Sequence, residues 1–346
     1  MKTFHKIIYK DSRDMKEISN ESIDLVVTSP PYPMIKMWDN MFSEDNKVIE
    51  EALEENDDKK SFELMHKELD KVWKELFRVL KPGGITCINI GDAVRTMNGN
   101  FSLYSNHSRV IESCSKIGFQ LLPEILWRKQ TNAPNKFMGS GTLPPGAYVT
   151  LEHEHILIFR KGSKREFGSH TEKLNRKNSS FFWEERNIWF SDIWENLKGT
   201  NQKLEDTKLR ERSAAFPFEL PYRLICMFSV KGDVILDPYL GTATTTLAAI
   251  ASERNSVGYE IDPNFDGKIK TRLENSRDFI NEYNEQRIAK HLDFIRKRKK
   301  EKGNLKYYNN KLDLPVMTRQ EVEASINKVV DIVKKNETDL EVSYSQ

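Results

Sequence analysis

Residues 24–32 read Asp24-Leu25-Val26-Val27-Thr28-Ser29-Pro30-Pro31-Tyr32, an apolar run that ends in two prolines and an aromatic residue. The apolar residues predict a short buried strand, because an acid precedes them and prolines follow them. The strand end brings a hydroxyl, a backbone kink and an aromatic ring to one place. Because Pro30 and Pro31 have no N–H group, the carbonyls around them are left as acceptors. Taken alone, the pattern also suits an X-Pro-Pro turn that closes a strand. A second stretch, Asp237 to Thr245, makes a functional site the favoured interpretation.

The composition limits the class of protein. The chain has 346 residues, enough for one large domain or two smaller ones. Charged residues make up 31% and hydrophobic residues 38%, and no apolar run could span a bilayer, so we expect a soluble protein without a membrane partner. The start, Met1 to Lys6, lacks the apolar core of a signal peptide. Cys87, Cys114 and Cys226 have neither zinc spacing nor a disulfide framework, so we expect a cytoplasmic protein with reduced cysteines.

Charge is unevenly distributed, although the net charge is only +2. Residues 39–70 hold twelve acids against four lysines, which indicates a strongly acidic segment. Residues 160–212 hold thirteen Lys and Arg against nine acids, interleaved with aromatic residues. A further basic cluster lies at Arg296–Lys300. This asymmetry permits a polyanion on one face, whereas most charge runs are solvated surface.

Strands and helices alternate along the chain. Hydrophobic patterns predict strands over Phe4–Tyr9, Asp24–Thr28, Ile85–Ile90, Leu121–Trp127, His155–Arg160, Asp233–Leu236 and Ser256–Glu260. They predict helices over Phe62–Leu80, Asn106–Ile117, Pro217–Phe228 and Ala243–Ser252, with a loop over Thr131–Thr150 and charged helices after Asp262. The acidic segment is predicted to be helical or partly disordered. The alternation predicts a mostly parallel α/β sheet with ligands at the carboxyl ends of its strands.

The second stretch, Asp237-Pro238-Tyr239-Leu240-Gly241-Thr242-Ala243-Thr244-Thr245, predicts a strand, a glycine turn and the start of a helix. Gly241 lets a ligand approach the backbone closely. One strand later, Glu260 is placed to accept hydrogen bonds from ribose hydroxyls, as in dinucleotide-binding folds. Nicotinamide or flavin binding would fit these features too. The chain has no Gly-x-Gly-x-x-Gly and no phosphate-binding Gly-Lys-Thr/Ser loop, so S-adenosylmethionine, with a ribose and no phosphate, fits better.

With both stretches in view, the chain resembles the β-class, permuted DNA amino-methyltransferases of the N4-cytosine/N6-adenine family, in their Ser-Pro-Pro-Tyr type. The resemblance covers about Tyr9 to Asp262. Further matching segments are Lys10–Ser12, Leu76–Gly84, Glu154–Lys161 and Ala215–Pro221. One departure is Ala243, which stands where the family usually has a second glycine.

The resemblance implies a Rossmann-like α/β fold with a mostly parallel, seven-stranded methyltransferase sheet. Residues 1–160 would form the catalytic part of the methyltransferase domain, with an acidic insertion at about 39–70. Residues 161–212 would be an inserted target-recognition region, although a covering subdomain with buried aromatic residues is an equal alternative. Residues 213–265 would complete the domain as its cofactor-binding part, and residues 266–346 would form a charged, helical C-terminal extension.

The resemblance also implies the site residues. The catalytic ones are Ser29, Pro30, Pro31 and Tyr32. The ones that bind S-adenosylmethionine are Asp11, Phe216, Pro217, Asp237, Tyr239, Gly241, Thr242, Thr244, Glu260 and Asp262. The Ser29 hydroxyl and the Pro30 carbonyl would accept hydrogen bonds from an exocyclic amine and localise its lone pair. Tyr32 would stack on the base after it is flipped out of the duplex.

Serine at the first motif position is commonest among N4-cytosine enzymes, so we expect double-stranded DNA as substrate and N4 of cytosine as target, with N6 of adenine as the alternative. A companion restriction endonuclease is implied by the family. C5 methylation of cytosine would need a cysteine nucleophile after a proline, and none of the three cysteines follows one. Other classes left open are a non-catalytic nucleic-acid-binding module and an RNA or protein methyltransferase. His153 and His155 share a strand face, but no third ligand is evident in the sequence, so we expect no metal.

Overall fold

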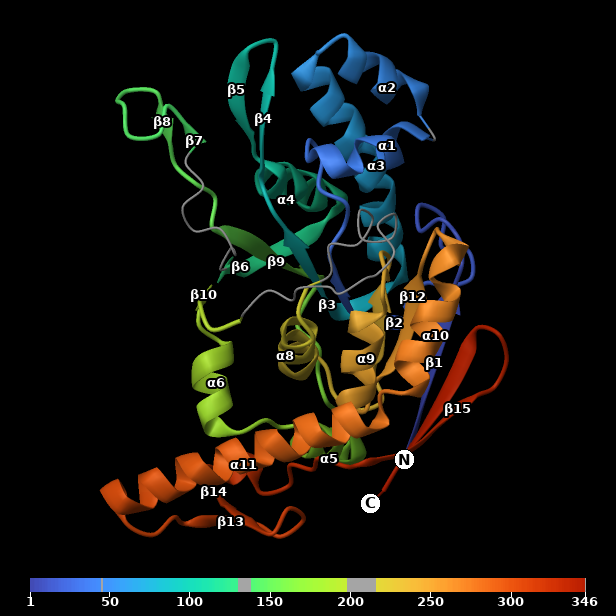
Figure 1. Cartoon of the computed structure of the whole chain (residues 1–346). Coiled ribbons are helices and arrows are strands. Elements are labelled where there is room, and N and C mark those ends of the chain that lie inside the picture. Colours follow the sequence, from blue (N-terminus) through green and yellow to red (C-terminus); the bar gives the residue numbers. More distant parts are fainter. Residues whose placement is uncertain (45, 130–137, 198–215, 346) are drawn as a thin grey trace.

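A single large sheet organises the computed structural model of the chain (Figure 1). The structure describes residues 1–44, 46–129, 138–197 and 216–345. Within these residues the sheet has ten strands, in the order β10-β6-β9-β3-β2-β11-β12-β1-β16-β15. Their bounds are β1 Lys2–Ile8, β2 Ile23–Thr28, β3 Leu80–Ile90, β6 Phe119–Arg128, β9 His153–Lys161, β10 Ile193–Trp194, β11 Val234–Asp237, β12 Asn255–Tyr259, β15 Val329–Lys334 and β16 Asp339–Tyr344. The five central strands, β3, β2, β11, β12 and β1, are parallel, so the predicted mostly parallel α/β sheet is confirmed.

The strands that precede the two motif stretches are neighbours in this sheet. Leu25 of β2 pairs with Ile235 of β11, and Val26 pairs with Leu236. All six residues of β2 are buried, as expected for a parallel strand that is covered on both faces. Because parallel strands end at the same edge of a sheet, the loop after β2 and the turn after β11 lie side by side.

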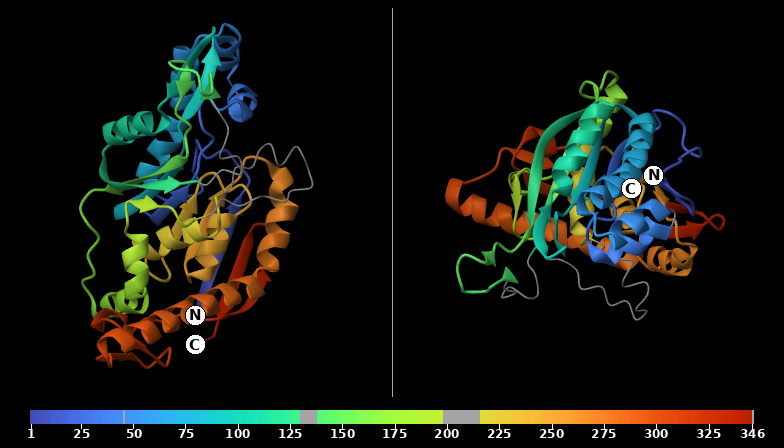
Figure 2. Two further views of the ribbon diagram at one scale, coloured as in Figure 1. Left: turned by 60° about the vertical axis from the view of Figure 1, so that its left-hand side comes forward. Right: turned by 90° about the horizontal axis from the view of Figure 1, so that it is seen from above.

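Helices cover both faces of the sheet (Figures 1 and 2). The helices are α1 Asp39–Glu44, α2 Lys47–Glu54, α3 Asp58–Val79, α4 Asn106–Ile117, α5 His170–Asn178, α6 Trp183–Trp189, α8 Glu219–Phe228, α9 Thr244–Ala251, α10 Asp266–Glu274 and α11 Arg277–Lys302. Val26 and Leu236 pack into an apolar cluster with α3 and α4. Leu25, Val27 and Ile235 pack into a second cluster with α8, α9 and α10 on the opposite face. The alternation follows from the two-residue period of a strand.

The acidic segment 39–70 is helical in its described residues, which confirms one of the two predicted alternatives. It contains α1, α2 and the first half of α3. The Asn46 side chain caps α2 by accepting a hydrogen bond from Val48 N, and the Asp57 side chain caps α3 by accepting one from Lys60 N. Short polar caps of this kind therefore fix where the helices begin.

Two short hairpins extend from the same side of the sheet as α1 and α2 (Figure 1). One is formed by β4 Ala93–Met97 and β5 Asn100–Tyr104, and the other by β7 Met138–Gly139 and β8 Ala147–Tyr148. The rings of Phe101 and Tyr148 stack with their centroids 4.4 Å apart, so the hairpins touch. The predicted loop Thr131–Thr150 thus contains a small hairpin, and residues 131–137 of that loop lie outside the described residues.

Two expectations about the sheet and the C-terminal tail are wrong. The sheet has ten strands where seven were expected, because β10 adds to one edge and β16 and β15 add to the other. The tail is helical only to Lys302, after which β13 Tyr307–Asn309 and β14 Leu314–Val316 form a hairpin and β15 and β16 form another. The side chains of β16 alternate in burial, and the strand pairs antiparallel with β1. The reason is that the free edge of β1 is a template for strand addition.

In the described part of the predicted target-recognition region, several aromatic side chains are buried. Phe182 stacks on His291 of α11 at 3.8 Å between ring centroids, and Trp189 contacts Tyr222 of α8 edge to face. This packing favours the covering-subdomain alternative for residues 161–197. Residues 198–212 lie outside the described residues, and the assignment of the whole region stays a prediction.

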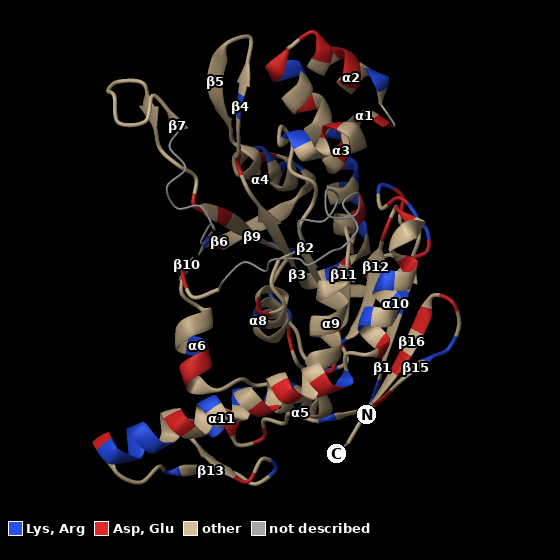
Figure 3. Cartoon of the chain, viewed as in Figure 1, with Lys and Arg blue, Asp and Glu red and all other residues tan. Residues whose placement is uncertain are grey.

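The basic cluster Arg296–Lys300 lies at the far end of α11, on the opposite side of the molecule from α1 and α2 (Figure 3). Arg296 pairs with Asp293 and Arg298 with Glu301 along the helix. This arrangement fits an exposed, solvated helix face. None of the helices in the described part of the chain combines the length and the hydropathy that crossing a bilayer requires.

Candidate active site

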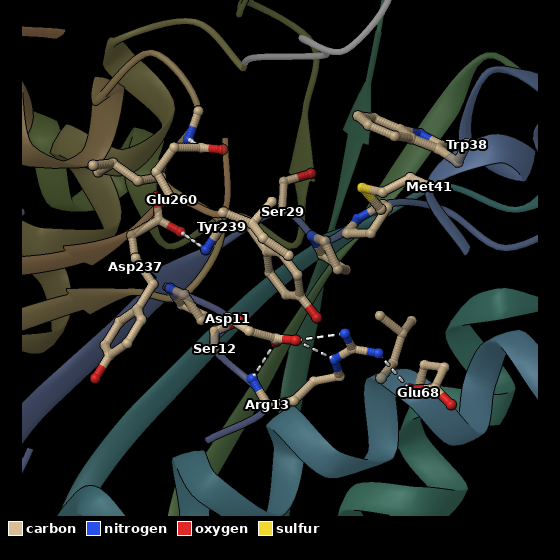
Figure 4. A pocket seen from close by; sticks show the side chains of 18 of the residues that line it. Asp11, Ser12, Arg13, Ser29, Trp38, Met41, Glu68, Asp237, Tyr239 and Glu260 are labelled. Atoms are coloured by element: carbon tan, nitrogen blue, oxygen red, sulfur yellow. Dashed lines mark hydrogen bonds and ion pairs between the residues drawn. The ribbon is translucent and has the colours of Figure 1, made fainter. Parts of the chain in front are cut away.

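A cavity lies at the carboxyl ends of β1, β2, β11 and β12, and both motif stretches line it (Figure 4). The predicted site residues that line it are Asp11, Ser29, Pro30, Pro31, Phe216, Asp237, Tyr239, Gly241, Thr242, Thr244 and Glu260. In Figure 4, Glu260 and Tyr239 lie on one side, Trp38 and Met41 lie on the other, and Ser29 lies between them. The fold therefore brings two stretches, about two hundred residues apart in sequence, to one concave surface, where parallel α/β sheets hold their ligands.

Asp237, one of the residues that line the cavity, ties β2 and β11 together. Its Oδ1 accepts a hydrogen bond from Thr28 Oγ1 at 2.7 Å, and its Oδ2 accepts one from Thr245 Oγ1 at 2.6 Å. Tyr239 N also donates to Oδ1, at 3.1 Å. Burial raises the pKa of the Asp237 carboxyl, while these hydrogen bonds oppose the rise. Both Asp237 oxygens are thus engaged by the protein, and the residue fixes the relative position of β2 and β11.

The turn after β11 is held in a left-handed conformation. Gly241 has a φ of +53°, and a Cβ atom placed on it would meet no atom within 4 Å, so its surface faces open space. Ala243 has a φ of +61°, a conformation that favours glycine. This geometry explains in physical terms why the resembled family usually has a glycine where Ala243 stands.

Glu260 at the end of β12 closes the same turn. Its Oε2 accepts a hydrogen bond from Gly241 N at 2.8 Å, and its Oε1 accepts one from Asp262 N at 2.9 Å. Burial raises the pKa of Glu260 to about 7, against the opposing effect of the two backbone donors. Each carboxylate oxygen has two lone pairs, so both can still accept from a ligand hydroxyl.

Arg272 of α10, a residue with no functional signal in the sequence, supports the turn from outside the cavity lining. Its Nη1 donates to Thr242 O at 2.6 Å, to Thr242 Oγ1 at 2.8 Å and to Thr244 Oγ1 at 3.0 Å. Burial lowers the pKa of this guanidinium. Two of the predicted cofactor-binding residues, Thr242 and Thr244, thus give hydroxyl acceptors to an arginine of the protein.

Asp11 lines the same cavity and is held by a chain of charged groups (Figure 4). Its Oδ1 accepts from Arg13 N at 2.8 Å, and its Oδ2 accepts from Arg13 Nε at 2.7 Å. Arg13 Nη1 in turn donates to Glu68 Oε2 of α3 at 2.7 Å. The acidic segment 39–70 therefore helps to position a predicted cofactor-binding carboxylate, a contact that was not evident in the sequence.

An apolar part of the cavity wall also comes from the acidic segment 39–70 and from the residue before it, Trp38. Trp38, Met41 and Phe42 line the cavity. Trp38 and Met41 lie opposite Glu260 (Figure 4). Phe42 is buried, whereas Trp38 and Met41 are only partly so. The sequence offered one signal, an aromatic and methionine group at the start of an otherwise acidic segment.

The loop after β2 places Ser29, Pro30 and Pro31 on the cavity and Tyr32 behind it. The Ser29 Oγ and Tyr32 Oη atoms are 3.0 Å apart. Tyr32 is buried, and its hydroxyl also contacts Asn89 of β3 and Glu154 of β9. Its stacking on a flipped base stays a prediction.

Two predicted cofactor-binding residues, Pro217 and Asp262, lie next to cavity residues but do not themselves line the cavity. Asp262 caps the short helix Pro263–Phe265 by accepting a hydrogen bond from Asn264 N. Pro217 adjoins Phe216, whose ring is on the cavity wall, and its carbonyl accepts from Leu220 N at 3.0 Å. Their contact with a cofactor stays a prediction.

His155 has more ligand-type neighbours than the sequence suggested. Asp92 and His107 lie beside it, so that one ligand atom from each of the three residues lies within 4.8 Å of the others. The sequence showed no such ligand because Asp92 and His107 are far from His155 along the chain. However, the rings of His107 and His155 stack at 3.8 Å with 13° between their planes, and two near-parallel rings cannot both hold one ion in plane. His107 Nδ1 is instead 2.8 Å from Asp92 Oδ2, and the absence of a metal stays a prediction.

The cysteines do not form a nucleophilic site. Cys87, Cys114 and Cys226 are free and buried, and burial raises the pKa of each thiol. A raised pKa disfavours the reactive thiolate. The exclusion of cysteine-based C5 methylation thus has a physical basis in addition to the sequence argument.

Comparison with known proteins identifies the class to which this fold and cavity belong. The profile of the family described as DNA methylase matches residues 23–271. The type II methyltransferase M.MthZI of Methanothermobacter thermautotrophicus is 53% identical over 93% of this chain and 89% of its own length. The type II methyltransferase M.MjaI of Methanocaldococcus jannaschii is 52% identical over 78% of this chain and 91% of its own.

Among solved structures, the DNA modification methylase TTHA0409 of Thermus thermophilus, described as putative and complexed with S-adenosyl-L-methionine, is similar. Its TM-score is 0.61 at 30% identity, with 78% of this chain and 93% of that chain covered. These matches define an α/β methyltransferase class. The chain belongs to the DNA methylase family.

Proposed function

We propose that this chain is a site-specific DNA methyltransferase that transfers a methyl group to the exocyclic N4 amine of cytosine in duplex DNA. The methyl donor is S-adenosylmethionine. The observation that carries the proposal is that Ser29 and Pro30 line the same cavity as Gly241 and Glu260. An amine acceptor site and a ribose-binding carboxylate thereby share one concave surface.

The residues on the cavity fit this cofactor. Glu260 offers carboxylate lone pairs for ribose hydroxyls beside the open face of Gly241. The aromatic and apolar side chains of Trp38, Met41 and Phe216 offer surface for a purine and for the methionine chain. A positively charged sulfur suits a cavity whose lining includes the carboxyl groups of Asp11 and Glu260. When bound, S-adenosylmethionine supplies an electrophilic methyl group on a sulfonium.

The protein's own contribution is to orient and activate the amine. The lone pair of an exocyclic amine is delocalised into the base, which makes it a weak nucleophile. In our proposal Ser29 Oγ and the Pro30 carbonyl accept hydrogen bonds from the two N–H groups of the amine. These hydrogen bonds localise the lone pair of the amine, which points toward the methyl donor. No described residue donates a hydrogen bond to the Pro30 carbonyl, so this oxygen has its lone pairs available. Such an arrangement needs no covalent intermediate.

The target base has to leave the duplex to reach this cavity, because a stacked and paired amine is inaccessible. In our proposal Tyr32 packs against the flipped base, and Pro31 stiffens the loop. Serine at position 29 supports N4 of cytosine as the target. The type II designation of the relatives supports a role in restriction–modification, with a companion restriction endonuclease as partner.

The test is the transfer of a labelled methyl group from S-adenosylmethionine to duplex DNA, RNA and protein, followed by mass spectrometry of the nucleosides. We expect label in duplex DNA and N4-methylcytosine in its digest. N6-methyladenine without N4-methylcytosine would replace cytosine by adenine as the target. Label only in RNA or protein would show that duplex DNA is not the substrate. No label in any of the three would favour a non-catalytic binding module.

A further inference from the structure

A chain of hydrogen bonds leads away from Ser29 into the protein interior. Ser29 Oγ lies 3.0 Å from Tyr32 Oη, and Tyr32 Oη lies 3.0 Å from Glu154 Oε2. Asn89 Nδ2 donates to Tyr32 Oη at 2.9 Å and to Glu154 Oε2 at 2.6 Å. Glu154 is on β9, is 9% exposed, and does not line the cavity. The chain therefore ends on a buried carboxyl group that has no place in the function proposed so far.

The direction of proton donation along this chain is fixed by its inner end. Glu154 Oε1 accepts from Lys129 Nζ at 2.7 Å, so the inner end of the chain is an ion pair between a carboxylate and an ammonium group. An ionised carboxylate can only accept, so the single proton of the Tyr32 hydroxyl is donated to Glu154 Oε2. Burial and the charge of Glu154 raise the pKa of Tyr32 well above its ordinary value, so the tyrosine keeps that proton.

The orientation of Ser29 follows from this direction. Because the Tyr32 proton is committed to Glu154, Tyr32 Oη can only accept in its contact with Ser29. The Ser29 hydroxyl must donate there, and its proton thus points away from the cavity. Both lone pairs of Ser29 Oγ are then left to accept from a ligand. Successive donation toward a carboxylate also polarises the chain and makes the terminal oxygen a better acceptor.

We propose that Glu154 is a positioning residue that, through Tyr32, holds Ser29 as a hydrogen-bond acceptor for the target amine. This inference rests on the proposed function, in which Ser29 meets that amine. Without the carboxylate, Tyr32 is free to donate to Ser29, and the Ser29 proton would then turn toward the N–H groups it has to accept. The polarity of the contact would be reversed, although every side chain in the cavity stayed in place.

The experiment measures single-turnover methyl transfer to duplex DNA at saturating S-adenosylmethionine for wild type, S29A, E154Q, E154D, Y32F and the double variant E154Q/Y32F. Calorimetric titration of the cofactor and thermal melting accompany each variant. We expect E154Q and Y32F each to slow transfer about tenfold or more, the size of losing a hydrogen bond to a charged group. Cofactor affinity should stay unchanged, because Glu154 and Tyr32 lie off the cavity.

Two comparisons separate a role in proton direction from a role in packing. Gln has the size of Glu but lacks its charge, whereas Asp keeps the charge in a shorter side chain. We expect E154D to transfer faster than E154Q, and a packing role would give the opposite order. We also expect the double variant to be no slower than the slower single variant, because both changes break the same chain.

E124Q is the matched control. Glu124 is on the neighbouring strand β6, and its Oε2 contacts His155 Nδ1 at 3.3 Å, outside the Ser29 chain. We expect E124Q to transfer at the wild-type rate. If E154Q fails to fold, Y32F still tests the inference, since it keeps the ring and removes only the hydroxyl.

The outcomes distinguish this inference from the function on which it rests. An inactive wild type, or an S29A variant as fast as wild type, would refute the role of Ser29 in the proposed function. An active wild type with a slow S29A, together with E154Q or Y32F at the wild-type rate, would overturn only the role of Glu154. If the loss of rate in E154Q/Y32F equals the product of the losses in the two single variants, the role of Glu154 would be overturned as well.

Discussion

The turn after β11 and the loop after β2 meet in one cavity, but they are stabilised in different ways. The turn is held by partners near it in sequence, since Tyr239 N donates to Asp237 and Gly241 N donates to Glu260, two and nineteen residues away. The loop depends on distant partners, since Tyr32 bonds to Glu154, 122 residues further along. In the turn, backbone N–H groups donate to carboxylates and Arg272 supports the threonines, whereas the loop is positioned by a buried group of polar side chains from distant strands.

This difference predicts different responses to substitution. Substitutions in the turn, which offers N–H groups and a carboxylate, should change the affinity for the cofactor. Substitutions in the loop, whose hydroxyl is oriented through a chain of hydrogen bonds, should change the rate of methyl transfer. Changes in the two regions should therefore separate binding from turnover.

The largest effect is expected for S29A. Removing the hydroxyl takes away one of two acceptors for the amine, and loss of one preorganised polar contact to a reacting group costs about 100-fold or more in rate. Cofactor affinity should not change, because the ribose carboxylate Glu260 is intact. Single-turnover transfer to duplex DNA and calorimetric titration of S-adenosylmethionine measure the two quantities. A variant that lost cofactor affinity but kept its transfer rate would contradict the division between the two regions.

The next effect concerns Glu260 and pH. Its pKa is raised to about 7 by burial, and hydroxyl donors of a ribose would favour the ionised form. Affinity for S-adenosylmethionine should therefore rise as the pH increases through about 7 and level off above it. The E260Q variant should bind about tenfold more weakly at high pH, as expected when an acceptor loses its charge.

The control is the pH profile of E260Q, which should be flat across the same range because the amide does not titrate. Calorimetric titration at pH values on both sides of the Glu260 pKa of about 7 would give both curves. A wild-type affinity that fell with rising pH, or an E260Q profile as steep as that of the wild type, would show that another group titrates.

A smaller effect is expected where the loop packs on β3. A Cβ atom on Gly91 would lie 2.9 Å from Tyr32 Cε2, so G91A should displace the tyrosine and slow transfer by less than about tenfold, an overpacking cost. Cofactor affinity should stay constant, because Gly91 does not line the cavity. G267A is the matched control: Gly267 lies in α10, and its added Cβ would meet no atom within 4 Å. Equal transfer rates for the two variants would argue against a fixed position of Tyr32.

The same contrast between local and distant contacts explains how much the sequence could predict. The positions of most central strands along the chain, and the edge at which the ligand sits, were predicted from short apolar runs, glycine and proline, whose effects are local. The sequence also identified Asp11, Ser29, Gly241 and Glu260, all of which line the cavity. These residues lie at strand ends, where position in the chain determines position in the fold.

The supporting residues could not be predicted in this way. Arg13, Glu68 and Arg272 are ordinary charged residues in sequence, and only tertiary packing brings Glu68 of α3 to Arg13 and Arg272 of α10 to Thr242. Glu154 reads as the start of a buried strand. The C-terminal strands were missed for a related reason, since β16 gains its place by pairing with β1 across nearly the whole length of the chain.

The smallest effects are expected at the two left-handed positions of the turn, and they test how much the backbone conformation contributes to this region. Gly241 and Ala243 have φ values of +53° and +61°. G241A should destabilise the folded protein by about 1 kcal/mol, because a Cβ atom disfavours this conformation. A243G should relieve the same strain, but it also removes a buried methyl group worth about 0.8 kcal/mol, so its net change should be close to zero.

Chemical denaturation of both variants measures these free energies. If the cofactor approaches the open face of Gly241, G241A should also weaken S-adenosylmethionine binding, whereas A243G, whose side chain is buried, should not. Transfer rates at saturating cofactor should match the wild type in both cases, since neither change reaches the Ser29 chain. A loss of rate at saturating cofactor would mean that the conformation of the turn also controls the loop after β2, and the separation between the two regions would fail.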